Sequence, residues 1–324
     1  MGDDSDIDSL MRWETDGAIP DAFQNRLTTH PAFAPAARAL AVNMLTAGAA
    51  DKALDGIFKD AGRYVVAMCA IYLHASGGLT LPRLKEICAH SGFLSPGRAR
   101  ALLIYLRYLG YAELFPLRTG GVARYQPTIR FMAAWRRQVR AALDAASIVE
   151  PAVRLVLDRL HEPDIFDAFV RQQSRGLLEW ARHDDGNLAF VSLFMHPHAG
   201  TQIVWALLAA ADEDDIFPPR GPLPISLSGT ARRFGVSRVH VRRILDDAER
   251  VGFLRYLEDG AVVLEDKGRA EIEHVYAGQL TQLLVSTAGT VRERPELTVP
   301  STRFALAPGV RPSAADAWTP PPPA

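Results

Sequence analysis

Arginine side chains gather in one stretch whose chemistry suits a polyanion. Residues 229–254, with the sequence GTARRFGVSRVHVRRILDDAERVGFL, contain six arginines and one histidine. The whole chain of 324 residues nevertheless has a formal net charge of only −1. An arginine guanidinium presents a planar fork of donors that matches phosphate oxygens and the O6 and N7 atoms of guanine. The stretch is therefore a candidate contact surface for nucleic acid.

The small and polar residues around these arginines predict two helices joined by a tight turn. Ala231 is small enough for the first helix to cross close to the second, and Gly235 suits the left-handed backbone of the turn. Ser237 is then the N-cap of the second helix. The apolar positions of that helix are Val241, Ile244, Leu245, Ala248 and Val251, with Val236 beside them at the turn. The basic residues of its first half therefore lie off the apolar stripe.

This stretch resembles the helix-turn-helix of bacterial transcription regulators, particularly those with winged-helix domains. The resemblance implies that the second helix enters the major groove of double-stranded DNA. On that helix Arg238 and Arg242 are expected to contact bases. Arg232 and Arg233, on the preceding helix, are expected to contact phosphates. The other residues of this copy expected at the interface are Ser237, His240 and Arg243.

A charged face without any partner is the alternative interpretation of these residues. Arg242 and Asp246 are four residues apart, as are Arg243 and Asp247. Each pair could form an ion pair along one helix. Such pairs would make a solvated surface rather than a binding site.

A second segment of the chain repeats the pattern. Residues 94–114 align with residues 236–256 without a gap, at a constant offset of 142. The matched pairs include Ser95 with Ser237, Arg100 with Arg242, Leu102 with Ile244, and Gly110 with Gly252. Two short strand-like runs around a glycine-containing turn follow each segment, at 111–128 and 253–266. The alternative is a chance likeness between two segments rich in Ala, Leu and Arg.

The duplication predicts a mainly helical protein with two tandem winged-helix units. Each unit is expected to contain three helices and a β-hairpin wing, preceded by additional helices. Local charge agrees with two basic surfaces: residues 81–140 carry ten arginines and one lysine against two glutamates. Residues 220–257 carry eight arginines against three acids. The near-neutral total therefore does not argue against DNA as a partner.

The first copy offers its own candidate DNA contacts. Ser95 is expected to cap its second helix, and Pro96 suits the first helical position. Arg98 and Arg100 extend from the start of that helix and are candidate contacts with DNA.

The two predicted wings differ in charge. Arg118 and Arg124 lie around a Gly-Gly turn in the first wing, where we expect them to touch the DNA backbone or the minor groove. The second wing carries Glu258 and Asp259 at its tip. Because carboxylates repel phosphates, we expect the second wing to stay off the duplex.

Composition divides the chain into four predicted regions. Residues 1–20 form an acidic flexible leader, with six acids and one arginine, and residues 286–324 form a Pro-rich disordered tail. The first helical and winged-helix unit spans 21–145, and the second spans 146–285. The acidic start does not look like a secretory signal, and no apolar run is long enough for a membrane. We therefore expect a cytoplasmic, nucleoid-associated protein.

Few residues of the sequence suit catalysis or metal binding. Cys69 and Cys88 are the two cysteines, and their spacing fits neither a disulfide framework nor a zinc site, so we expect both to be buried. His196 and His198 lie in a Pro-containing loop without a nearby third ligand and predict a turn. Motifs for phosphate, dinucleotide or hydrolase chemistry are absent from the sequence. We expect no enzymatic activity, no cofactor and no metal.

The sequence leaves the partners partly open. Double-stranded DNA is the expected partner, bound by a monomer with pseudo-two-fold symmetry or by a homodimer. A small-molecule effector of unknown identity could lie between the helices of 169–195. The alternative functions are a protein–protein scaffold, as in chromosome-condensation subunits that contain winged helices, and a plasmid-type replication initiator.

Overall fold

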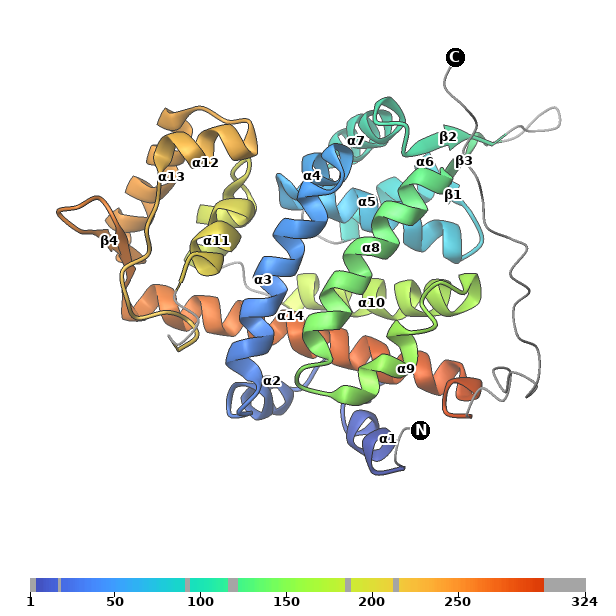
Figure 1. The fold of residues 1–324 in the computed structure, drawn as a ribbon. Helices are drawn as coiled ribbons and strands as arrows, with labels where there is room; N and C mark the ends of the chain where they lie inside the picture. The colour runs from blue at the N-terminus through green and yellow to red at the C-terminus, as the bar shows by residue number, and fades with distance from the viewer. Residues whose placement is uncertain are drawn as a thin grey trace, which may run out of the picture.

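The described residues fold mainly into helices, with two small antiparallel sheets (Figure 1). The computed structural model describes residues 4–16, 19–90, 94–115, 122–183, 188–211 and 216–299. Within those ranges, none of the helices combines the length and the apolar composition that crossing a membrane requires. The mainly helical class predicted from the sequence is confirmed.

Residues 61–127 contain three helices and a three-stranded sheet. The elements are α5 (Ala61–Ala75), β1 (Leu79–Thr80), α6 (Leu81–His90), α7 (Pro96–Tyr108), β2 (Ala112–Leu114) and β3 (Arg124–Pro127). The middle strand of the sheet is β3, which pairs antiparallel with both neighbours. Tyr125 is opposite both Leu79 and Leu114. The strands of the predicted hairpin are thus present, and the two-residue strand β1 extends it.

A second group of elements has the same order. The elements are α11 (Gly200–Ala209), α12 (Leu227–Phe234), α13 (Arg238–Arg250), β4 (Leu254–Tyr256) and β5 (Val262–Leu264). Leu223, between α11 and α12, forms an isolated antiparallel bridge with Val262 of β5. Because β5 therefore lies between Leu223 and β4, the strand order matches that of the first sheet.

The two groups share backbone geometry at the junction between helix and hairpin. Gly110 and Gly252, which are 142 residues apart, have φ values of 69° and 70°. A left-handed backbone at the end of a helix favours glycine. The next residue donates from its amide to the last turn in both copies, from Tyr111 to the Leu106 carbonyl at 2.8 Å and from Phe253 to the Ala248 carbonyl at 2.9 Å.

Helices outside the two groups hold them together in one continuous hydrophobic core. The N-terminal ones are α1 (Asp4–Met11), α2 (Asp21–Thr28), α3 (Phe33–Ala49) and α4 (Lys52–Phe58). The others are α8 (Ile129–Ala146), α9 (Arg154–Leu157), α10 (Pro163–His183) and α14 (Asp266–Glu293), with short 3-10 turns at Pro151–Val153 and Pro295–Leu297 and a π-helical turn at Val191–Met195.

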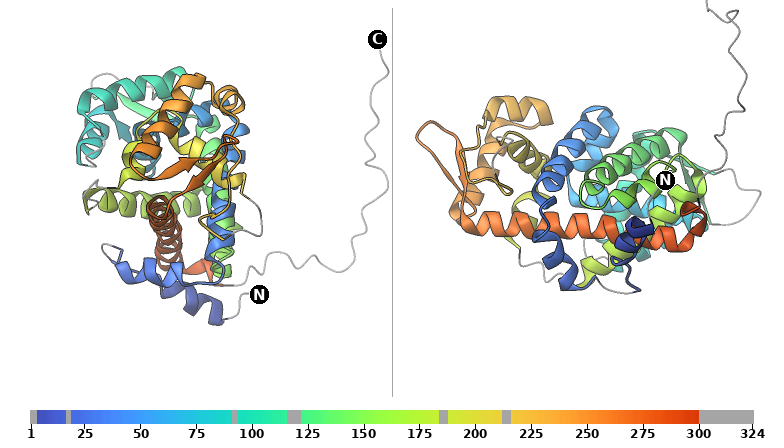
Figure 2. Two further views of the ribbon diagram at one scale, coloured as in Figure 1. Left: turned by 90° about the vertical axis from the view of Figure 1, so that its left-hand side faces the viewer. Right: turned by 60° about the horizontal axis from the view of Figure 1, so that its bottom comes forward.

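Three of these helices bridge the predicted halves of the chain. Helix α3 packs against both α8 and α11, and α10 packs against α5. The 28-residue helix α14 runs below both groups in Figure 1 and crosses most of the width of the molecule, and it packs against α10 and against β5 (Figures 1 and 2). The two groups are therefore held in one packed body by helices from both halves of the sequence.

The described ends of the chain are more ordered than the composition suggests. Leu10 and Trp13 are buried, and Trp13 packs edge-on against Phe23 of α2, so this part of the expected flexible leader is fixed. The prediction that the disordered tail begins at residue 286 is also wrong, because α14 continues to Glu293. Its residues 286–291, STAGTV, are small and buried, and small residues let α14 approach α10 closely. Residues 300–324 lie outside the described part.

Candidate nucleic-acid interface

The α12–α13 pair is built by side-chain caps and one left-handed turn. The Ser226 hydroxyl accepts from the Gly229 amide at the start of α12. Gly235 ends that helix at φ 62° and ψ 39°, as the sequence predicts. The Ser237 hydroxyl accepts from the His240 amide at 3.1 Å and so caps α13. The turn and both caps therefore fix where α13 begins relative to α12.

The apolar side of α13 packs into the core nearly as predicted. Val241, Ile244, Leu245 and Ala248 are buried, and Ala231 of α12 is buried against the same core. Val251 differs from the prediction, since it is 42% exposed. The reason is that α13 ends at Arg250, so Val251 lies beyond the helix at its C-cap.

The opposite side of the pair is exposed and cationic. Residues 226–245 contain five arginines and no acid. All five are exposed: Arg232, Arg233, Arg238, Arg242 and Arg243. Within the described part of the chain, the side chains of Arg232 and Arg238 form neither a hydrogen bond nor an ion pair, whereas the Arg233 guanidinium lies over the Phe234 ring. The unpaired guanidinium of Arg238, at the start of α13, and that of Arg232, in the last turn of α12, are available to a phosphate or a base edge.

Of the two ion pairs that the alternative interpretation expects on α13, the one between Arg242 and Asp246 is present. Arg242 Nε is 3.4 Å from Asp246 Oδ1, and its guanidinium lies over the Tyr256 ring at 5.2 Å. The Tyr256 hydroxyl donates to the same Asp246 oxygen, and burial, followed by the Asp246 charge, raises the pKa of Tyr256 to about 12. Arg242 is therefore held by a carboxylate and a ring, although its side chain is 57% exposed.

Arg243 does not form its expected pair with Asp247 in the described structure. Asp247 instead accepts from Arg250 at 2.7 Å. Arg243 donates to His240 Nδ1 at 3.1 Å, and His240 Nε2 donates to the His198 carbonyl at 2.7 Å. Because a carbonyl can only accept, the proton of His240 is on Nε2. Both ring nitrogens of this predicted DNA contact therefore have partners within the protein.

The first copy has the same capped helix start. The Ser95 hydroxyl accepts from the Arg98 amide at 3.3 Å, and Pro96 occupies the first helical position. Arg98 is paired with Asp60 at 3.3 Å, so its guanidinium is partly committed inside the protein. Arg100 and Arg124 are exposed, and the side chain of neither forms a hydrogen bond or ion pair to the described residues. Arg118 lies outside the described part of the chain.

The hairpin between β4 and β5 has an acidic tip. Glu258 and Asp259 are both exposed there. The Asp259 carboxylate accepts from the Ala261 amide at 3.0 Å, and Gly260 completes the turn at φ 85°. The turn chemistry therefore accounts for Asp259 without any external partner.

A junction that the sequence does not reveal connects α12 to the first half of the chain. Lys59, just after α4, donates from Nζ to the Phe234 carbonyl at 2.8 Å. Its own carbonyl accepts from the Ala199 amide at 2.7 Å. One residue further, buried Asp60 accepts from Arg98 of α7 and pairs with Arg63. Lys59 thus contacts α12, the helix before α13, and Asp60 contacts α7.

The two helices that the sequence singles out lie along the same edge of the molecule. In Figure 1, α7 and the α12–α13 pair are both at the upper edge, with α4 between them, and Figure 2 also places both groups at the top of its left view. Their arrangement on one side is a requirement for contacting one duplex together.

The described residues offer little for metal or small-molecule chemistry. They contain no group of three or more potential metal ligands, and His196 and His198 lie in the bend and turn before α11, as the sequence predicts. Cys69 and Cys88 form no disulfide, and both are fully buried.

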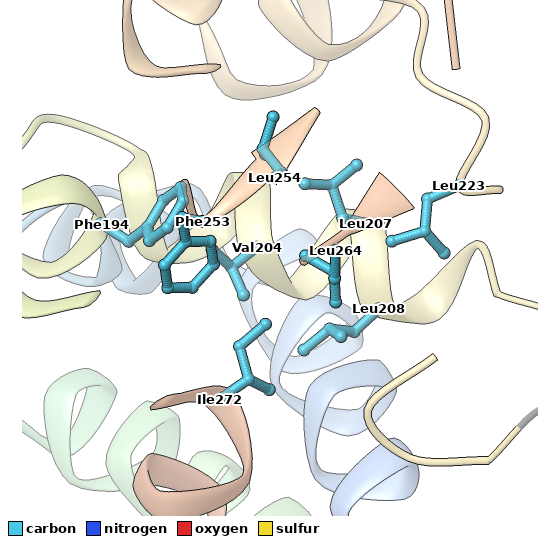
Figure 3. A pocket seen from close by; sticks show the side chains of 9 residues that line it. All are labelled: Phe194, Val204, Leu207, Leu208, Leu223, Phe253, Leu254, Leu264 and Ile272. Atoms are coloured by element: carbon cyan, nitrogen blue, oxygen red, sulfur yellow. The ribbon is translucent and has the colours of Figure 1, made fainter. Parts of the chain in front are cut away.

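A cavity beside α11 is too small for an effector. Its volume is about 10 Å³, the lower limit for a single water. Figure 3 shows its lining of apolar side chains from α11, the hairpin and the start of α14, including Val204, Phe253 and Ile272. We infer that it is a packing gap of the core.

Comparisons with protein-family models, with curated proteins and with solved structures yield no significant match.

Proposed function

We propose that this protein is a transcriptional regulator that binds double-stranded DNA sequence-specifically through two tandem winged-helix units. The observation that carries the proposal is the exposed first half of α13, where the Arg238 side chain has no partner among the described residues and lies near Arg242 and Arg243. A capped helix with arginines at its start, presented by a tight turn, fits the dimensions and the donor–acceptor pattern of the major groove.

The order of elements supports the same proposal. Each group runs helix, strand or bridge, helix, helix, and hairpin, with the last strand in the middle of its sheet. This is the order of a winged-helix unit, in which the third helix is the recognition helix. In this proposal α7 and α13 are the recognition helices, and the hairpins are the wings.

The proposed role of each basic residue follows from its position on the helices and from its partners in the protein. Arg238 and Arg242 contact bases, because they extend from the first half of α13 on its exposed side. Arg232 and Arg233 contact phosphates from α12, and Arg100 and Arg124 contribute the contacts of the first copy. His240 positions Arg243 rather than touching DNA, since both of its ring nitrogens are occupied.

Binding to duplexes selected by the purified chain tests the proposal. Affinity should fall steeply with salt, because each arginine–phosphate contact releases counterions. Arg238→Ala should cost about 1–3 kcal/mol and relax the preference at one base position, whereas Arg232→Ala should weaken all sequences alike and lower the salt slope by about one. Arg250→Ala is the matched control on α13, because its guanidinium is paired with Asp247 near the far end of the helix.

A protein–protein scaffold gives a different result in the same experiment. It would show weak duplex binding without sequence preference, and Arg238→Ala would produce no change in the relative affinities for different sequences. That outcome would overturn the proposal.

A further inference from the structure

Helix α7 exposes an apolar stripe that its own packing does not explain. The stripe consists of Gly97, Ala101, Ile104 and Tyr108, whose spacing places them on one side of the helix. All four are exposed, Ile104 by 54% and Tyr108 by 85%. A row of exposed apolar side chains on one helix face is typical of a contact surface.

The same positions of α13 carry different chemistry. At the offset of 142 the α7 stripe corresponds to Val239, Arg243, Asp246 and Arg250. Three of these four residues are charged, whereas the α7 stripe has no charged member. The two helices share the same cap and the same turn into the hairpin. We therefore attribute the difference in charge between these two faces to different contacts rather than to different folds.

Arginines outnumber acids around the α7 stripe in the sequence. Between residues 94 and 130 the described ranges contain Arg98, Arg100, Arg107, Arg124 and Arg130, against Glu113 as the one acid. Arg98 is paired with Asp60 and Arg130 with Asp51, which leaves Arg100, Arg107 and Arg124 without an ion pair to the described residues. A second copy docked on this stripe by two-fold symmetry would bring these arginines against each other, which is unfavourable. A polyanion complements them.

We propose that the α7 stripe reads the C5-methyl groups of thymine in the major groove through Ala101 and Ile104. Thymine methyls are the apolar groups that base edges present in that groove, and they make apolar contacts with side chains. A Cβ on Gly97 would meet nothing within 4 Å, so the helix start is open to the groove. The inference rests on the proposed function and refines it: the preferred DNA has a half-site read by arginines and a half-site read by methyl contacts.

The experiment replaces thymine with deoxyuridine, which lacks the methyl group, in one half of a selected duplex at a time. The α13 half is identified as the half whose sequence preference Arg238→Ala relaxes, and the other half belongs to α7. Each replaced thymine under α7 should weaken binding by about four-fold, the effect of losing one buried methyl group. Ile104→Ser should remove that sensitivity, whereas Ile148→Ser, at an exposed isoleucine just beyond the far end of α8, should retain it.

Two results would overturn the inference while leaving the proposed function intact. In the first, duplex binding is specific but deoxyuridine is neutral in the α7 half. In the second, Ile104→Ser changes neither affinity nor the effect of deoxyuridine, which would show that Ile104 does not contact the thymine methyl groups. The proposed function itself fails only if no duplex sequence is preferred, so the two failures are distinguishable. An unchanged melting temperature for Ile104→Ser shows that the variant is folded.

Discussion

The Lys59 ammonium group donates a hydrogen bond to the Phe234 carbonyl at 2.8 Å, although the two residues are 175 positions apart in the sequence. Phe234 is the last residue of α12, directly before the Gly235 turn. The cation therefore satisfies a carbonyl at the helix C-terminus, where positive charge is favourable. Because Lys59 is followed by Asp60, which pairs with Arg98 of α7, one short segment contacts both α7 and the helix that precedes α13.

Lys59→Ala should destabilise the protein by about 1.5–3 kcal/mol, since a hydrogen bond to a charged donor is lost and a carbonyl is left without its partner. Chemical denaturation measures the change. Lys52→Ala is the matched control, because Lys52 is exposed at the start of α4 and should change stability little. Equal destabilisation by both variants would contradict the role given to Lys59.

The two roles of Ser237 can be separated by its replacements. Ser237→Ala should cost about 1 kcal/mol of stability, because the cap of α13 is lost. Ser237→Asp should retain stability, since aspartate also accepts from the helix amides, but its charge should repel phosphate and lower affinity for the selected duplex. Melting temperature and duplex binding, measured on both variants, give the comparison. An Asp variant that binds DNA as tightly as the parent would place Ser237 away from the duplex.

Gly235→Ala should destabilise the protein by about 1–2 kcal/mol, because an L-residue with a side chain is strained at φ 62°. The added methyl group would also meet Lys59 Nζ at 3.4 Å. Gly97→Ala is the control, since its Cβ would enter open space in a helix, and its stability should be equal or higher. The measurement is the free energy of unfolding in denaturant. A neutral Gly235→Ala would argue against the left-handed turn.

Acid should destabilise the protein through His198. Burial, together with the charges of Arg63 and Lys59, lowers the pKa of His198 below its ordinary value. The unfolded chain therefore takes up the proton first as the pH falls below about 6.5, so stability decreases from there until the pH is below the folded-state pKa. His198→Gln should flatten this slope of unfolding free energy against pH, and exposed His274→Gln should not. Identical slopes in all three proteins would rule out His198 as the source.

Local signals in the sequence predict the α12–α13 pair well. Ser237, Gly235 and Ala231 each act over a few residues, as a cap, a turn and a close helix crossing, so their effects do not depend on the rest of the fold. The alignment at an offset of 142 residues predicts the equivalent cap at Ser95 and the equivalent glycine turn at Gly110, and both are present. The division into two winged-helix units stays a prediction.

Long-range contacts could not be predicted in the same way. No sequence motif relates Lys59 to Phe234, so their hydrogen bond could not be predicted. The extension of α14 past Ser286 depends on small residues that pack on α10 rather than on a periodic apolar pattern. Leu223 and β1 contribute too few residues to a sheet for an alternating pattern to be visible. The partners of Arg98 and His240 likewise come from distant segments, which composition cannot reveal.

Selection of duplexes from a genomic library by the purified full chain, at moderate salt, tests the central claim most directly. The account predicts enrichment of a non-palindromic site with two unlike halves, because α7 and α13 expose different residues at equivalent positions. The double variant with Arg238→Ala and Arg242→Ala should lose the preference in one half and retain it in the other. If no sequence is enriched over the starting library, the protein is not a sequence-specific DNA-binding regulator.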